Sequence, residues 1–179
     1  MKTVYFVRHG LSEGNVAGVT SGAEHNVPLT EEGKQQALRA GQDLRDKNID
    51  LVVCSPLIRT VQTAELIAGE LGYDPKKILQ REDFIERYMG IYSGKPHDEY
   101  RAAVLSNTAH ESLEKPEQML ERISKGLEWL KTQDAQTIVL VAHGGVGRIL
   151  RIIHEALELD DMYKIEGFAN TAIYKFTLQ

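Results

Sequence analysis

The stretch TIVLVAHGGVGRIL, residues 137–150, opens with the most apolar run of the chain and continues into a histidine, two glycines and a second apolar pattern. A short apolar run without polar interruptions predicts a strand that is buried on both faces and central in its sheet. Beyond the glycines, apolar side chains recur at helical spacing, at Val146, Ile149, Leu150, Ile153 and Leu157. A buried strand that leads directly into an amphipathic helix is typical of α/β folds.

Strand and helix patterns alternate along the rest of the chain. Strands are predicted at residues 4–7, 49–56 (IDLVVCSP, which Pro56 ends) and 78–80. Helices are predicted from the N-cap Thr30 to about residue 47, and at 57–71, about 97–107 and 116–132. The segment 81–96 has no clean period and is expected to be an ordered loop. The closing stretch TAIYKFTL (171–178) alternates, which predicts an antiparallel strand at or near an edge.

This order of elements predicts a three-layer α/β/α sandwich with a mostly parallel central sheet, in one domain that spans residues 1–179. With 42% hydrophobic and 26% charged residues, the composition is that of an ordinary globular protein. The net charge of -5 argues against a surface for nucleic acid or for an anionic membrane. The chain has a single cysteine, Cys54, and only a short apolar N-terminal run, so we expect a cytoplasmic protein without an internal disulfide.

Charged and small residues follow three of the predicted strands. Arg8, His9 and Gly10 end the first strand, Ser55 and Pro56 lead from the second toward Arg59, and His143, Gly144 and Gly145 end the central one. In open α/β sheets, ligands bind beyond the carboxyl ends of the strands. If these strands are parallel neighbours, two histidines and two arginines meet at one place.

Phosphoryl transfer requires such a set of groups. Its transition state spreads negative charge over three oxygens, which the rigid fork of an arginine can bind two at a time. A neutral histidine can attack phosphorus through one ring nitrogen while a hydrogen bond holds the other, and glycines let backbone N–H groups approach a phosphate. Taken singly, each of these residues is equally typical of a strand cap or a solvated surface side chain.

Four segments together resemble the histidine phosphatase superfamily, in its phosphoglycerate-mutase-like branch: RHGLSEGN (8–15), PLTEEGKQQA (28–37), SPLIRTVQTAELIA (55–68) and VLVAHGGVGRIL (139–150). The resemblance implies a phosphoglycerate-mutase-like fold in which His9 is the nucleophile that accepts the phosphoryl group. It implies that Arg8, Arg59 and His143 form the phosphate pocket, joined by Gly144. It also places Asn15 beside the substrate, although a turn or helix cap is an equal interpretation of that residue, and Ser21 and Gly22 at the pocket wall.

The general acid is expected to be a carboxylate, because a leaving alkoxide needs a proton. Glu82, Asp83 and Glu86 crowd the loop after the third strand, and composition does not choose among them. The segment ERYMGIYSG (86–94) resembles the family's corresponding loop, and this resemblance selects Glu86. Arg87 is expected either to contact the substrate or to pair with a carboxylate of the loop. Four residues are candidates for a lid over the leaving group: Tyr88, Met89, Tyr92 and His97.

The chain also departs from the family pattern. Asn26 stands where many relatives have aspartate, and Leu113, Glu114 and Lys115 stand where many have Gly-Glu-Ser. Phosphoglycerate mutases of the family are longer and carry a basic insertion. In the segment 95–117 here, the three Lys and Arg residues are outnumbered by Asp and Glu, which predicts a poor site for a substrate carboxylate.

These features predict a metal-independent phosphatase that hydrolyses small phosphomonoesters through a phosphohistidine on His9 and needs no cofactor. The alternatives are a phosphoglycerate mutase or another phosphate-transferring relative and, outside enzymes, a phosphoprotein-binding or regulatory module. A cysteine phosphatase is disfavoured because Pro56, which has no N–H to donate, lies between Cys54 and Arg59. A metal hydrolase is disfavoured because the six histidines form no short-range ligand pair.

Overall fold

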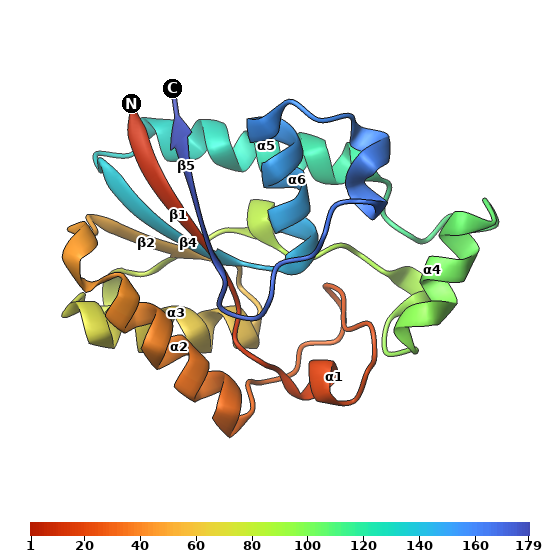
Figure 1. The fold of residues 1–179 in the computed structure, drawn as a ribbon, viewed down its shortest axis with the longest axis horizontal. Coiled ribbons are helices and arrows are strands. Elements are labelled where there is room, and N and C mark those ends of the chain that lie inside the picture. Colours follow the sequence, from red (N-terminus) through yellow and green to blue (C-terminus); the bar gives the residue numbers. More distant parts are fainter.

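The computed structural model describes residues 1–179, which form five strands in one sheet and six α-helices around it (Figure 1). The sheet order is β3-β2-β4-β1-β5. Four strands are parallel: β1 (Lys2–Arg8), β2 (Leu51–Cys54), β3 (Leu79–Gln80) and β4 (Thr137–Ala142). The last strand, β5 (Ile173–Leu178), lies antiparallel to β1 at the edge, so the predicted mostly parallel sheet with an antiparallel closing strand is confirmed.

Strand β4 occupies the centre of the sheet, as its apolar sequence predicts. Ile138 and Leu140 pack into the larger core cluster on one face, whereas Val139 and Val141 pack into the second cluster on the other. All four side chains are inaccessible to solvent. Successive side chains of a strand point to opposite faces of the sheet. A strand with both faces buried therefore needs an unbroken apolar run.

The two faces of the sheet are covered by different helices (Figure 1). Helices α5 (Pro116–Thr132) and α6 (Gly144–Glu155) pack on one face, and α2 (Glu31–Asp43) and α3 (Ile58–Leu71) pack on the other. The short α1 (Glu13–Val16) and α4 (His97–Leu105) lie beyond the carboxyl ends of the parallel strands. The three-layer α/β/α prediction is therefore confirmed.

Local signals in the sequence locate several helix ends. The hydroxyl of Thr30 accepts the N–H of Gly33 at 3.0 Å and caps α2, and Pro116 occupies the first turn of α5. Helix α2 stops at Asp43, and a 3₁₀ turn, Arg45–Lys47, completes the segment predicted as helix. The predicted loop 81–96 holds two 3₁₀ turns, Glu82–Phe84 and Gly90–Tyr92.

The prediction for the apolar face of α6 was partly wrong. Val146, Ile149 and Leu150 are buried, but Ile153 is 39% exposed and the buried residue at that end of the helix is Ile152. The core contact of α6 therefore rotates by one position near its C-terminus, toward the 3₁₀ segment Leu159–Tyr163 that packs against it. Neither this segment nor α1 was predicted. No helix has the length and apolar character needed to cross a membrane.

Candidate active site

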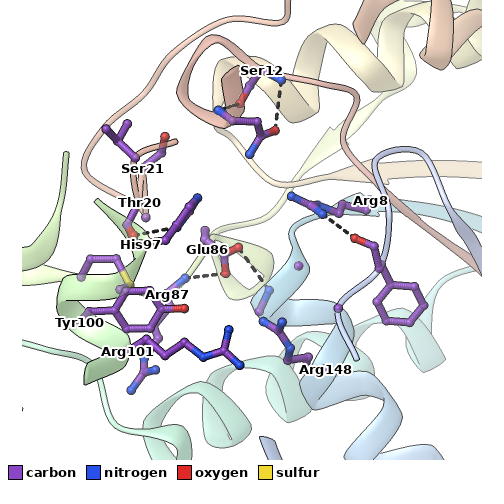
Figure 2. Close-up of a pocket in the computed structure, with 18 of the residues that line it drawn as sticks. Arg8, Ser12, Thr20, Ser21, Glu86, Arg87, His97, Tyr100, Arg101 and Arg148 are labelled. Carbon is purple, nitrogen blue, oxygen red and sulfur yellow. Dashed lines mark hydrogen bonds between the residues drawn. The ribbon is translucent and has the colours of Figure 1, made fainter. Parts of the chain in front are cut away.

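A cavity of about 370 Å³ lies at the carboxyl ends of the parallel strands, and several of the predicted strand-end residues line it: Arg8, His9, Arg59, Gly144 and Gly145. Figure 2 shows Arg8 among the side chains around this cavity. Arg8 and His9 reach it from the end of β1, Arg59 from the first turn of α3, and Gly144 from the start of α6. Residues that are far apart in the sequence meet here because β1 and β4 are parallel neighbours, with Arg8 opposite Ala142.

The two histidines stand side by side. The rings of His9 and His143 meet edge to face, with centroids 5.3 Å apart and planes at 62°. The backbone explains this placement, because the N–H of His9 donates to the carbonyl of Ala142 at 3.0 Å and extends the β1–β4 ladder by one residue. Each histidine therefore follows directly on a strand of the central pair.

The ring of His9 is oriented for attack through one nitrogen. Its Nδ1 lies 2.7 Å from the carbonyl oxygen of Gly10, which can only accept, so Nδ1 carries the proton in the neutral ring and Nε2 keeps a lone pair. Burial and then the positive charges of Arg59 and Arg8 hold the pKa of His9 well below 6.5. The ring is consequently neutral at pH 7, the form in which an imidazole nitrogen is nucleophilic.

His143 is completely buried and does not itself line the cavity. Its Nε2 lies 2.7 Å from the hydroxyl of Ser55, and its Nδ1 is buried without a partner. Burial, followed by the charge of Arg59, lowers the pKa of His143 well below 6.5. If the Ser55 hydroxyl donates to Nε2, the neutral ring holds its proton on Nδ1 and can donate it to a ligand. No role for Ser55 was predicted; the available signal was its place at the end of β2, next to β4.

Two arginines enter the site without a carboxylate partner. Arg59 is 2% exposed, and its guanidinium donates only to the carbonyls of Gly22, at 2.8 Å, and His25, at 3.3 Å. Arg8 donates to the carbonyl of Phe168, and its Nε is buried with no partner. Burial lowers the pKa of Arg59 to about 10, so it remains charged at pH 7. An uncompensated buried charge is costly, so this pair favours an anionic ligand.

Of the three candidate carboxylates, only Glu86 lines the cavity. Its Oε1 accepts the N–H of Arg87 at 2.9 Å, and its Oε2 accepts the N–H of Gly145 at 3.2 Å (Figure 2). A Cβ at position 145 would overlap Oε1 of Glu86, so a side chain there would displace this carboxylate. Glu82 is exposed, and Asp83 pairs with Arg81 outside the cavity.

A buried ion pair holds the loop that carries Glu86. Arg122 on α5 donates to the carbonyls of Asp83, Ile85 and Glu86, at 3.0, 2.7 and 3.3 Å. The same guanidinium pairs with the carboxylate of Glu114 at 2.8 Å, and the carbonyl of Glu114 accepts from Nε of Arg87 at 2.7 Å. The segment 113–115 looked like a departure from the family pattern, yet its glutamate supports this loop. Sequence reasoning missed both Arg122 and this function of Glu114.

The other residues predicted to bind the substrate also lie at the cavity wall. Asn15, Ser21, Gly22 and Arg87 all line the cavity. Asn15 also caps α1, because its Oδ1 accepts the N–H of Ser12 at 3.1 Å and the amide of Asn170 at 3.2 Å. The two interpretations of Asn15 are therefore both compatible with its position.

Only two of the four candidates for a lid over the leaving group lie at the cavity. Met89 and His97 line the cavity, whereas Tyr88 and Tyr92 do not. Lining residues that the sequence did not single out come from α4, α6 and the segment after α6: Tyr100, Arg101, Arg148, Met162, Tyr163, Gly167 and Phe168.

Cys54, the centre of the cysteine-phosphatase alternative, points into the core between the sheet and helices α2 and α3. Burial raises the pKa of its thiol to about 12, so the thiolate that such chemistry needs is strongly disfavoured. No group of three or more His, Cys, Asp and Glu side chains is placed to hold a metal ion.

Inorganic phosphate or vanadate is expected to raise the melting temperature, because either anion neutralises the buried guanidinium of Arg59. At a hundred times its Kd, a ligand that binds only the folded state stabilises it by about 2.7 kcal/mol. Arg59→Met should abolish the shift, measured by thermal unfolding with and without the anion. The matched control is Arg45→Met, which removes an exposed arginine paired with Glu70 and should keep the full shift. An unchanged shift in folded Arg59→Met would contradict anion binding at Arg59.

Comparison with known proteins identifies related sequences and related folds. The model of the histidine phosphatase superfamily (branch 1) matches residues 4–179. The chain is 30% identical over 175 residues to the putative phosphoserine phosphatase 2 of Hydrogenobacter thermophilus, covering 92% of this chain and 84% of that protein. It is 33% identical over 153 residues to the probable phosphoglycerate mutase GpmB of Erwinia tasmaniensis, covering 80% and 70%.

The chain also matches two agropine synthesis reductases of Rhizobium rhizogenes, at 34% and 33% identity over 89% and 82% of its own length. It spans only about a third of those proteins, 36% and 34% of their lengths. Among solved structures, Bacillus stearothermophilus YhfR superposes with a TM-score of 0.88 at 25% identity, covering 100% of this chain and 92% of that one.

Proposed function

The chain belongs to the histidine phosphatase superfamily, branch 1, and on that premise we propose that it hydrolyses small phosphomonoesters through a phosphohistidine formed on His9. One observation carries this proposal: a neutral, buried histidine with a free Nε2 stands beside the buried Arg59 and the partly buried Arg8, neither of which has a carboxylate partner. This arrangement supports the proposal, because phosphoryl transfer to a histidine needs a nucleophile for phosphorus and positive charges for its oxygens.

The first step forms the bond from Nε2 of His9 to phosphorus and breaks the bond from phosphorus to the ester oxygen. Arg8 and Arg59, which line the cavity, bind the phosphoryl oxygens, where negative charge is concentrated, and the ring of His143 packs against His9 behind them. Glu86 gives its proton to the departing oxygen, so the alcohol leaves neutral and Glu86 becomes a carboxylate. The carbonyl of Gly10 stabilises the positive charge of the phosphorylated ring through Nδ1–H.

The second step returns His9 to its starting form. Water attacks phosphorus in line with the phosphorus–nitrogen bond while the carboxylate of Glu86 takes its proton. The bond from phosphorus to Nε2 then breaks, inorganic phosphate leaves, and Glu86 is protonated again. Glu86 acts as acid in one step and base in the next, so a single carboxylate at the cavity is sufficient.

A phosphate-transferring enzyme is the second candidate, because the chain also matches probable phosphoglycerate mutases. The two functions differ in what accepts the phosphoryl group from His9. In a mutase the phosphoryl group returns to the organic substrate, whereas in a phosphatase it passes to water. The family does not exclude a phosphoprotein-binding module, but a binding module has no need for Glu86 beside the cavity.

Water is expected to be the acceptor, and turnover is expected to need no metal. With 3-phosphoglycerate as substrate, release of phosphate should exceed formation of 2-phosphoglycerate. Turnover should persist in EDTA and be blocked by vanadate, whose trigonal-bipyramidal adduct resembles the transition state. The measurement follows phosphate and both phosphoglycerates in one reaction. Faster exchange than release would indicate a mutase, and loss of activity in EDTA with recovery on adding a divalent ion would contradict the metal-independent mechanism.

A further inference from the structure

The cavity continues beyond the phosphate end into a second basic region formed by Arg87, Arg101 and Arg148. These side chains come from the loop of Glu86, from α4 and from α6. In Figure 2 the guanidinium groups of Arg101 and Arg148 point toward one another across the cavity. Three like charges close together repel one another, which is unfavourable unless an anion binds between them.

No carboxylate neutralises these three arginines. Arg101 makes no hydrogen bond or ion pair, and Arg148 donates only from Nε, to the carbonyl of Ile165 at 3.2 Å. Arg87 donates from Nε to the carbonyl of Glu114, and its guanidinium carbon lies 5.5 Å from the centre of the Tyr163 ring. The terminal nitrogens of all three are therefore free to bind a ligand.

The charge of the cavity exceeds what one phosphoryl group requires. Five arginines line it against two carboxylates, Glu86 and Asp98, although the chain as a whole carries a net charge of -5. A phosphate monoester carries close to two negative charges at neutral pH. Arg8 and Arg59 face that group, and once Glu86 and Asp98 are also counted the cavity still keeps a net positive charge, which comes from Arg87, Arg101 and Arg148.

We infer that the substrate carries a second anionic group, a carboxylate or a second phosphate, on its alcohol part, and that Arg101 and Arg148 bind this group. The inference rests on the proposed phosphatase function, which it makes more specific. A cavity of about 370 Å³ has room for a small organic part beside the phosphoryl group. Tyr100 and Tyr163 line the same region and can pack against that organic part.

The composition of segment 95–117 predicts a poor site for a substrate carboxylate, whereas the inference places an anion beside Arg101 of the same segment. Glu99 pairs with Lys95 on the surface, at 2.9 Å, and Glu114 pairs with Arg122 below the Glu86 loop. Glu99 and Glu114 therefore have other partners, whereas Asp98 of the same segment lines the cavity together with Arg101. The second arginine, Arg148, comes from outside the segment altogether.

A matched pair of substrates tests the inference. The compounds 3-phosphoglycerate and glycerol 3-phosphate differ only in a carboxylate against a neutral CH₂OH group, and 1,3-propanediol bisphosphate supplies a second phosphate instead. Of 3-phosphoglycerate and 1,3-propanediol bisphosphate, we expect the better substrate to have a kcat/KM about tenfold to a hundredfold above that of glycerol 3-phosphate. Charge-assisted hydrogen bonds to the second anionic group allow a gain of this size. Whichever compound is preferred identifies the second group as carboxylate or phosphate.

Variants locate the preference. The ratio to follow is kcat/KM for the preferred compound divided by kcat/KM for glycerol 3-phosphate. Arg101→Gln and Arg148→Gln should each reduce this ratio, and the double variant should bring it close to one. Arg101 is exposed and its replacement should not affect folding, so it remains informative if Arg148→Gln, which loses the bond to Ile165, is unstable. Arg39→Gln, which removes an exposed charge from α2, is the matched control and should leave the ratio unchanged.

A binding measurement separates this inference from the proposed function. Calorimetry on His9→Asn compares the Kd values of 3-phosphoglycerate, 1,3-propanediol bisphosphate and glycerol 3-phosphate without relying on turnover. Equal affinities for all three would overturn the inference even if p-nitrophenyl phosphate were hydrolysed. Absence of hydrolysis with any phosphomonoester would instead overturn the proposed function, while a preference in Kd that Arg101→Gln removes would still support the anion site.

Discussion

Replacing His9 by asparagine is expected to lower kcat by about 10⁵-fold or more, a loss of the size seen when a covalent nucleophile is removed. The expectation follows from geometry, because His9 is the one ring at the cavity whose Nε2 is free while Nδ1 is held by a carbonyl. Asparagine can still fill part of the space and hydrogen-bond, but it cannot form a phosphohistidine. The buried arginines remain, so substrate binding should survive far better than turnover.

The wild-type protein should therefore carry label on His9 during turnover. Reaction with a ³²P-labelled monoester, quenched in alkali, should yield a phosphoenzyme that is stable in base and lost in acid. His9→Asn should show no label, and His154→Asn, which changes an exposed histidine near the end of α6, should label normally. Label on Cys54 or on a serine would contradict the mechanism, as would full labelling of His9→Asn.

Replacing Glu86 by glutamine should produce a loss that depends on the leaving group. Glutamine keeps the size of the side chain but cannot deliver a proton. General acid catalysis contributes about 10²–10⁴-fold, so this loss is expected in the chemical step with alkyl phosphates such as glycerol 3-phosphate. With p-nitrophenyl phosphate the loss should be much smaller, because p-nitrophenolate departs without protonation. Single-turnover rates are needed, since hydrolysis of the phosphohistidine or product release could otherwise limit kcat.

Two neighbouring carboxylates provide the controls for Glu86. Glu82→Gln changes an exposed side chain, and Asp83→Asn weakens only the pair with Arg81, so neither should alter either rate greatly. Equal losses on both substrates in Glu86→Gln would assign Glu86 to binding or structure instead of proton transfer. A loss at Glu82 or Asp83 that depends on the leaving group would show that the wrong carboxylate was chosen.

The sequence by itself determined the sheet and the edge where the site forms. The apolar run 137–142 is long enough to be buried on both faces, which is why β4 could be placed at the centre. Periodicity placed Arg8, His9 and His143 at strand ends, and parallel strands bring their carboxyl ends to one edge. Local signals sufficed because each of these residues directly follows a strand. The structure added that β1 and β4 are parallel neighbours, which brings these residues together. The face of α6 was harder to predict, since Ile152 and Ile153 are both apolar and only the packing of Leu159–Tyr163 selects between them.

Contacts between distant segments decided the rest. Glu86 is held at the cavity by its hydrogen bond to Gly145 and by the support of its loop by Arg122, which lie 59 and 36 residues away in the chain. The partner of His143, Ser55, is 88 residues distant. Arg101 lies in no motif, and Arg148 lies in the family-like segment 139–150 without being singled out there. Periodicity reports which side of an element faces the core, but the direction of a loop side chain depends on what packs around it, so these positions required the tertiary structure.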